Sequence, residues 1–314
     1  MGLRAIVLGS AAGGGFPQWN SAGPGCMRAR AGDAAALPRT QTSLAVTADG
    51  ARFVLLNAAP DLRAQILATP ALAPRPAPGE VRHSPIAAVV LTAAEIDTIA
   101  GLLTLRERHG FALYGTRQSL AVLAENPIFN ALDPARVPRR DLPSDSPVAL
   151  RGAEGGTLGL VVEGFAVPGK VPLFAEQAGA DPGRTEEGET VGVRIAAEAE
   201  PDRGLFFIPG CAAMTPVLAD RLRGAACVLF DGTLWQDDEM ILAGAGPKTG
   251  ARMGHMSIAG PDGVIAAFRE LGVARKILIH LNNTNPVLLS DSRAHAEVLR
   301  AGWEIAHDGM EITL

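Results

Sequence analysis

The chain has 314 residues, 47% of them hydrophobic, and a formal net charge of −5 at pH 7. Its length allows a large core in one large or two small domains, whereas the acidic balance and the lack of a basic run argue against nucleic-acid binding. Cys26, Cys211 and Cys227 are too widely spaced for a disulfide framework, and no apolar stretch has the length of a membrane span. We therefore expect a cytoplasmic protein with reduced thiols and no membrane partner.

The chain begins with elements typical of a β-rich fold. The apolar run at 3–8 predicts a strand, and a glycine-rich loop follows at 9–15. The loop lacks the G-x-G-x-x-G spacing and precedes no helical pattern, so close backbone approach is favoured over phosphate binding. Residues 42–47 and 52–57 predict two strands joined by an Asp-Gly hairpin turn, and a helix follows near Pro60.

The stretch at 86–106 places two carboxylates between a strand and a helix. Residues 86–91 are apolar and β-branched, which predicts a buried strand, and an apolar helical pattern resumes at 99–106. Glu95 and Asp97 lie between them, where α/β sheets place ligands. A second interpretation is that both are solvated carboxylates facing the start of a helix.

From residue 111 on, runs of predicted strands alternate with single predicted helices. Strands are predicted at 111–114, 158–167, 190–196, 204–208, 226–230, 276–280 and near 303–307, and helices at 118–125, 214–222, 265–271 and 293–301. Residues 137–150 are expected to be connecting structure, and 177–189 an exposed loop that could act as a lid. Asp97, Pro209, Asp231 and His280 each follow a predicted strand, which favours two sheets packed face to face with helices outside.

Six long segments together carry a family resemblance. They are GSAAGGGFPQWN (9–20), RTQTSLAV (39–46), LLNAAPDLRAQI (55–66), FDGTLWQDDEM (230–240), KTGARMGHM (248–256) and LIHLNNTNPVL (278–288). Together they resemble the PqqB family of pyrroloquinoline quinone biosynthesis proteins, within the metallo-β-lactamase fold superfamily. The resemblance implies an α/β protein: a single metallo-β-lactamase-like αβ/βα sandwich over 1–314.

The resemblance also implies a function. The family is similar to iron-dependent oxygenases that hydroxylate a tyrosine in a Glu-Tyr-type precursor with O2. The alternative is a non-catalytic carrier of the quinone or its precursor, with a degenerate metal site. Either role implies a small peptide-derived or quinone partner, and a homodimer is left open.

The sequence departs from the family at two metal motifs. The superfamily loop H-x-H-x-D-H corresponds here to Ala93, Glu95, Asp97 and Thr98, so its last histidine is a threonine. A hydroxyl is a poor ligand for Fe(II), and we expect weak or partial iron occupancy. The family's C-x-C-x-x-C motif corresponds to Ser21, Gly23 and Cys26. One thiol cannot form a tetrahedral structural zinc site, so this zinc is expected to be absent.

The resemblance places His280 and Asp97 at superfamily ligand positions. Both residues follow predicted core strands, so we expect them to converge in one cleft close enough to share a metal. One histidine and one carboxylate are two of the three ligands of a facial triad, and Glu95 is a candidate for the third. For His280 the alternative is a hydrogen-bonded structural histidine, and for Glu95 a solvated residue at a helix start.

Five further residues complete the candidate site. His255 lies in a glycine-rich loop and is a candidate general acid or base, or a residue that orients another group; the alternative is a loop histidine bonded to backbone. Asp231 follows a buried strand and could accept a hydrogen bond from a ligand histidine. Asn282, Asn283 and Asn285 could hold a peptide backbone, although such residues before a proline are also common turn formers.

Overall fold

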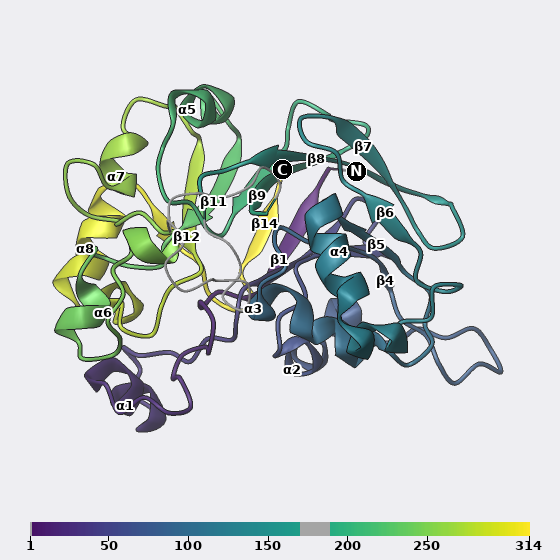
Figure 1. The fold of residues 1–314 in the computed structure, drawn as a ribbon, viewed down its shortest axis with the longest axis horizontal. Coiled ribbons are helices and arrows are strands. Elements are labelled where there is room, and N and C mark those ends of the chain that lie inside the picture. Colours follow the sequence, from purple (N-terminus) through teal and green to yellow (C-terminus); the bar gives the residue numbers. More distant parts are fainter. Residues whose placement is uncertain (1, 170–188) are drawn as a thin grey trace.

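A computed structural model describes residues 2–169 and 189–314. Two seven-stranded sheets form the body of the molecule (Figure 1). The first has the spatial order β14 (Glu311–Thr313), β1 (Arg4–Gly9), β2 (Ser43–Thr47), β3 (Phe53–Leu56), β4 (Ile86–Val90), β5 (Ala112–Gly115) and β6 (Arg139–Asp141). The second has the order β13 (Glu304–Ile305), β12 (Arg275–Ile279), β11 (Cys227–Asp231), β10 (Leu205–Ile208), β9 (Val191–Ala197), β8 (Thr157–Ala166) and β7 (Pro147–Arg151).

Each sheet combines a parallel and an antiparallel part. Strands β3 to β6 are parallel in the first sheet, as are β10 to β13 in the second. The remaining neighbours pair antiparallel, including β1 with β14, which brings the two ends of the chain together. The parallel strands give each sheet an edge at which several carboxyl ends meet, and such an edge is where α/β folds bind ligands.

The core lies in three layers. Side chains alternate along each strand, so that in β1 Ala5 and Val7 pack between the sheets while Ile6 and Leu8 pack on the outer face. Because both faces are covered, the strands are almost continuously apolar. The inter-sheet layer contains Phe207 and Leu229, both fully buried.

Helices cover the two outer faces. Leu62 and Leu123, from α2 (Leu62–Ala68) and α4 (Arg117–Glu125), pack against the first sheet. The second sheet is covered by α5 (Pro216–Leu222), α7 (Val264–Ala267) and α8 (Arg293–Arg300), and α1 (Pro24–Arg30) joins the same apolar layer. Among the described residues, the other helices are α3 (Ile96–Ile99) and α6 (Glu239–Leu242), and the 3-10 turns are η1 (Pro70–Leu72), η2 (Ala100–Leu105), η3 (Pro127–Ala131), η5 (Ala251–Met253) and η6 (Pro286–Leu288).

The predicted sandwich is confirmed, and several elements differ from expectation. Residues 137–150 contain β6 and the start of β7, whose polar sequences suit edge strands with one exposed face. The helix predicted at 99–106 starts earlier, as α3, and continues as a 3-10 turn. The loop predicted over 177–189 lies, apart from Glu189, outside the described residues. No helix in the described part of the chain has both the length and the apolar character required to span a bilayer.

Candidate metal and active site

A cavity of about 410 Å³ lies where the carboxyl ends of the parallel strands of both sheets meet. Asn57 follows β3 and Thr92 follows β4 on one side, while Pro209, Thr233 and His280 follow β10, β11 and β12 on the other. The glycine-rich loop after β1 forms a further wall. The fold therefore collects residues from distant parts of the chain at one edge of the sandwich.

Asp97 and His280 converge in this cavity. Asp97 lies in the first turn of α3, and His280 directly follows β12. His280 Nε2 lies 3.1 Å from Asp97 Oδ2, and both side chains are less than one-fifth exposed. Burial acts to raise the pKa of Asp97, but the hydrogen bond and charge of His280 outweigh it, so the pKa is lowered. Burial likewise opposes the charged form of His280, but its bond to Asp97 and the nearby carboxylates raise its pKa.

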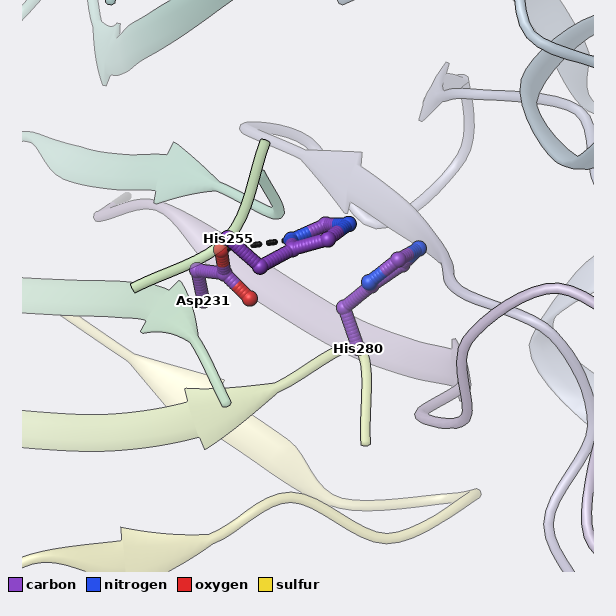
Figure 2. A group of neighbouring side chains, drawn as sticks. All are labelled: Asp231, His255 and His280. Atoms are coloured by element: carbon purple, nitrogen blue, oxygen red, sulfur yellow. Dashed lines mark hydrogen bonds and ion pairs between the residues drawn. The ribbon is translucent and has the colours of Figure 1, made fainter. Parts of the chain in front are cut away.

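His255 lies beside His280 and is held by Asp231. His255 Nδ1 is 2.7 Å from Asp231 Oδ2, at the end of β11. The two imidazole rings stack with their centroids 5.3 Å apart and their planes at 25°. Figure 2 shows both rings side by side, with their outer nitrogen edges directed the same way. Asp231 thus accepts a hydrogen bond from a histidine that lines the cavity.

Asp231, His255 and His280 offer possible ligand atoms within 4.8 Å of one another. The carboxylate of Asp231, however, already accepts four hydrogen bonds, from Cys211 N–H, His255 Nδ1–H, Thr233 N–H and the Thr233 hydroxyl. A carboxylate has about four lone-pair sites, so these donors saturate it. Asp231 is fully buried and is not part of the cavity wall, whereas Asp97 is. Of the two aspartates, Asp97 is therefore the one that faces the cavity, in contact with the His280 ring.

Asn282, Asn283 and Asn285 have different surroundings and different hydrogen-bond partners. Asn282 lies in the cavity wall, and its amide donates to Thr284 Oγ1 and Met240 Sδ. Asn283 is buried and bonded to Gln18. Asn285 donates to the carbonyl groups after β11 and caps η6, which are roles of a turn former. Only Asn282 of the three faces the cavity, so it is the one placed to touch a ligand.

Glu95 and Thr98 also line the cavity. Glu95 is the residue before α3, and its role as a ligand stays a prediction. The Thr98 hydroxyl lies 2.9 Å from Ala93 O and 2.8 Å from Glu95 O. These carbonyl groups take its hydrogen, so Thr98 closes the turn before α3 and does not replace the expected histidine.

Thr233 was not among the residues expected in the site. Its hydroxyl lies 2.6 Å from Asp231 Oδ1, 2.8 Å from His280 Nδ1 and 3.1 Å from His255 Nδ1. The sequence contained one signal, the segment Asp-Gly-Thr directly after a buried strand. The three partners come from separate segments of the chain, so only the fold could identify them.

The chain is similar to known proteins at two levels, a superfamily and a family within it. A family model described as "Beta-lactamase superfamily domain" matches residues 52–281, and the chain belongs to this superfamily. Coenzyme PQQ synthesis protein B of Gluconacetobacter diazotrophicus is 57% identical, and that of Gluconobacter oxydans 52%, each over 99% of both chains. The crystal structure of Zn²⁺-bound PqqB from Methylobacterium extorquens is 46% identical with a TM-score of 0.92, over 99% of this chain and 100% of that one. Within the superfamily, the chain belongs to the coenzyme PQQ synthesis protein B family.

The expectation for metals was wrong. The relative from Methylobacterium extorquens is a zinc-bound protein, which points to zinc rather than to its absence, and iron is not shown. The prediction considered only a cysteine site, and Cys26 is indeed a buried thiol 3.6 Å from Asn283 Oδ1. Zinc also binds imidazole and carboxylate groups, and His255, His280 and Asp97 supply that donor set without cysteine.

Proposed function

We propose that this chain binds a peptide-derived precursor of the quinone in the cavity and hydroxylates its tyrosine ring in a metal-dependent reaction. The observation that carries the proposal is the convergence of Asp97, His255 and His280 on one cavity wall. A volume of about 410 Å³ suits a small ligand, since such sites commonly measure about 300–1,000 Å³. Membership of the coenzyme PQQ synthesis family supports a precursor of that coenzyme as the ligand.

We assign the metal to Asp97, His255 and His280. Three protein ligands of imidazole and carboxylate type are the set that catalytic zinc sites use, with one position open for water or substrate. Bound metal would supply Lewis acidity and a place for an oxygen ligand. His280 is well placed for this directly after β12, Asp97 lies in the first turn of α3, and Asp231 orients His255 from outside the cavity.

Hydroxylation sets a further requirement. One atom of O2 enters the tyrosine ring and the other leaves as water, so each turnover consumes two electrons and two protons from an external reductant. Zn²⁺ does not change its oxidation state. The reaction therefore needs a redox-active divalent metal at the same ligands, and the experiment below identifies it.

The residues around the metal would bind and orient the precursor. The Asn282 side chain faces the cavity from the strand-end loop. Thr284 and Met240 take its two amide hydrogens, so its Oδ1 would accept a hydrogen bond from a peptide N–H group. Thr92 and Asn57 bond to each other in the opposite wall and are buried. Walls that are rigid on both sides would hold the tyrosine ring in one orientation.

The test uses metal-stripped protein reloaded with one divalent metal at a time. A Glu-Tyr-containing peptide is incubated with ¹⁸O2 and a reductant, and mass spectrometry measures incorporation of one ¹⁸O atom. We expect incorporation with a redox-active metal, none with zinc alone, and a loss of at least 100-fold in Asp97→Asn. Asp220→Asn, an exposed aspartate on α5, is the matched control and should retain activity. No incorporation with any metal would contradict the proposal.

One observation favours a carrier as the second candidate. Thr98 occupies the position of a family histidine, and backbone carbonyl groups already engage its hydroxyl, which leaves the site with fewer ligands than the superfamily motif. A carrier would bind quinone in the same cavity and release it unchanged. Calorimetric binding of the quinone by metal-free protein, without any product in the ¹⁸O experiment, would support this role. The homodimer and the cytoplasmic location stay predictions.

A further inference from the structure

We propose that Thr233 is a positioning residue whose hydroxyl determines which nitrogen of His280 faces the metal. This inference rests on the proposed function, in which His280 is a metal ligand. The hydroxyl lies within 3.1 Å of the Asp231 carboxylate, of one nitrogen each of His255 and His280, and of the His280 carbonyl oxygen. Side chains that orient a ligand histidine commonly change metal affinity by about 10- to 100-fold when they are removed.

The contacts of this hydroxyl favour one arrangement of hydrogens. A threonine hydroxyl has one hydrogen and two lone pairs. Asp231 Oδ1 is an acceptor at 2.6 Å, the shortest of the contacts, and an ionised acceptor makes the stronger bond, so the hydrogen points to it. The oxygen of Thr233 must then accept at 2.8 Å from His280, which requires a hydrogen on Nδ1 of that ring.

The position of the hydrogen on the neighbouring His255 ring also follows from its hydrogen-bond partners. His255 Nδ1 lies 2.7 Å from Asp231 Oδ2 and 3.1 Å from the Thr233 hydroxyl. Asp231 can only accept, so Nδ1 of His255 also carries a hydrogen. His280 Nε2 lies 3.1 Å from Asp97 Oδ2 and donates to it in the absence of metal. When that hydrogen leaves while Nδ1 keeps its own, the Nε2 lone pair of each ring would be free for a metal, and Figure 2 shows these outer edges side by side. Asp231 and Thr233 thus bind the Nδ1 atoms of both rings, which would leave the Nε2 atoms for a metal.

The backbone supports the same assignment. His280 has a left-handed conformation, with φ of 62°, which costs a residue with a Cβ about 1 kcal/mol or more. Leu281 N–H donates to Ser10 O at 3.0 Å, and Asn282 N–H donates to Thr233 O at 3.0 Å. These bonds hold the turn that directs the His280 ring into the cavity. Thr233 therefore contacts the His280 region through both its side chain and its main chain.

The first test compares Thr233→Val, which removes the hydroxyl at similar volume, with Thr233→Ser, which keeps it. Zinc dissociation constants are measured by competition with a chromophoric chelator. We expect the constant to rise about 10- to 100-fold in Thr233→Val and to stay within about threefold of wild type in Thr233→Ser. Thr47→Val removes another buried hydroxyl, in the β2–β3 hairpin, and should leave zinc affinity unchanged. Equal affinity in wild type and Thr233→Val would overturn the proposal.

The second test reads the ring nitrogens directly. In zinc-loaded wild-type protein with ¹⁵N-labelled histidine, NMR should show a hydrogen on Nδ1 of His280 and zinc on Nε2, with His280→Ala used for assignment. Zinc on Nδ1 would overturn the proposal, and this spectrum decides it even where Thr233→Val does not fold. Neither measurement involves oxygen or peptide, so failure of the hydroxylation experiment leaves the role of Thr233 standing. A wild type that binds no zinc would instead contradict the proposed metal site.

Discussion

At the scale of single residues, the number of hydrogen bonds that a side chain already makes separates the ligands from their supports. Asp231 accepts four hydrogen bonds and has no lone pair left, whereas Asp97 Oδ2 meets the His280 ring at the cavity wall. Thr98 and Thr233 are both buried hydroxyls beside this cavity, but one bonds to backbone carbonyl groups and the other to the rings of the site. Residue type alone therefore does not decide a role here.

The substitution Thr98→His tests the departure from the superfamily motif. Thr98 follows Asp97 in α3 and lines the cavity, so an imidazole at position 98 would add a ligand to the same site. We expect zinc to bind at least about tenfold more tightly, since imidazole is a good zinc ligand and a hydroxyl is not. A chelator-competition titration measures this, with Thr98→Val as the control that adds no ligand. Equal zinc affinity in wild type and Thr98→His would show that position 98 does not reach the metal.

At the scale of elements, strand ends position the site, and ion pairs at the sheet edge position the strands. His280 follows β12, which pairs with the two-residue edge strand β13. Arg275 at the start of β12 makes two contacts with the carboxylate of Glu304 in β13, at 2.6 and 2.8 Å. This ion pair joins the edge strand β13 to β12, the strand that His280 follows.

The substitution Glu304→Gln tests that ion pair through its pH dependence. The hydrogen bond and charge of Arg275 lower the pKa of Glu304 below its ordinary value of 4.5, although burial opposes this. The stabilisation is therefore fully present above pH 4.5 and is lost as the pH falls through the lowered pKa. Because Glu304 is 41% exposed, we expect wild type to exceed Glu304→Gln by only about 0.5–1 kcal/mol at pH 7 in urea unfolding.

The same difference should shrink toward zero as the pH is lowered below 4.5. Glu125→Gln, on α4, is the control, because Glu125 makes no ion pair with a residue that the structure describes. A difference between wild type and Glu304→Gln that grows on acidification would have the wrong sign for this ion pair.

At the scale of the whole molecule, the site joins the two sheets. Asp97 follows β4 of the first sheet, and His280 follows β12 of the second. The apolar layer between the sheets holds their strand ends at the spacing the site requires. Metal binding and packing of this layer should therefore depend on each other.

The substitution Phe207→Ala tests the layer between the sheets. Phe207 is fully buried there, and removing such a ring costs about 3–5 kcal/mol of unfolding free energy, because apolar contacts are lost and a void remains. Urea unfolding of the metal-free protein measures the cost. Val217→Ala, at a side chain that is 75% exposed, should change stability by less than about 0.5 kcal/mol. If Phe207→Ala lowered the unfolding free energy as little as the control does, the Phe207 ring would not contribute to the stability of the core.

Zinc should stabilise the native state because the proposed ligands come from both sheets. At a free zinc concentration 100 times the dissociation constant, we expect the unfolding free energy to rise by about 2.7 kcal/mol. Thermal unfolding with zinc and after chelator treatment measures the shift, which should disappear in His280→Ala. A zinc-dependent shift that persists in His280→Ala would locate the bound ion elsewhere.

The sequence alone determined the sandwich and the approximate position of most strands. Apolar runs such as 204–208 and 226–230 correspond to β10 and β11, because a strand buried on both faces must be apolar throughout. The polar edge strand β6 escaped prediction, because one exposed face removes that signal. Pattern also placed Asp97 and His280 after core strands, where ligand residues are common.

How these residues contact one another depends on the tertiary structure. The family resemblance led us to expect Asp97 and His280 in one cleft, but they are 183 positions apart, and no local pattern encodes their contact at 3.1 Å. The same holds for Asp231, whose exclusion from the cavity follows from four donors that fold around it. Local sequence fixes periodicity and turns, whereas the partners of a buried polar group depend on which strand ends the packing of two sheets brings to one edge.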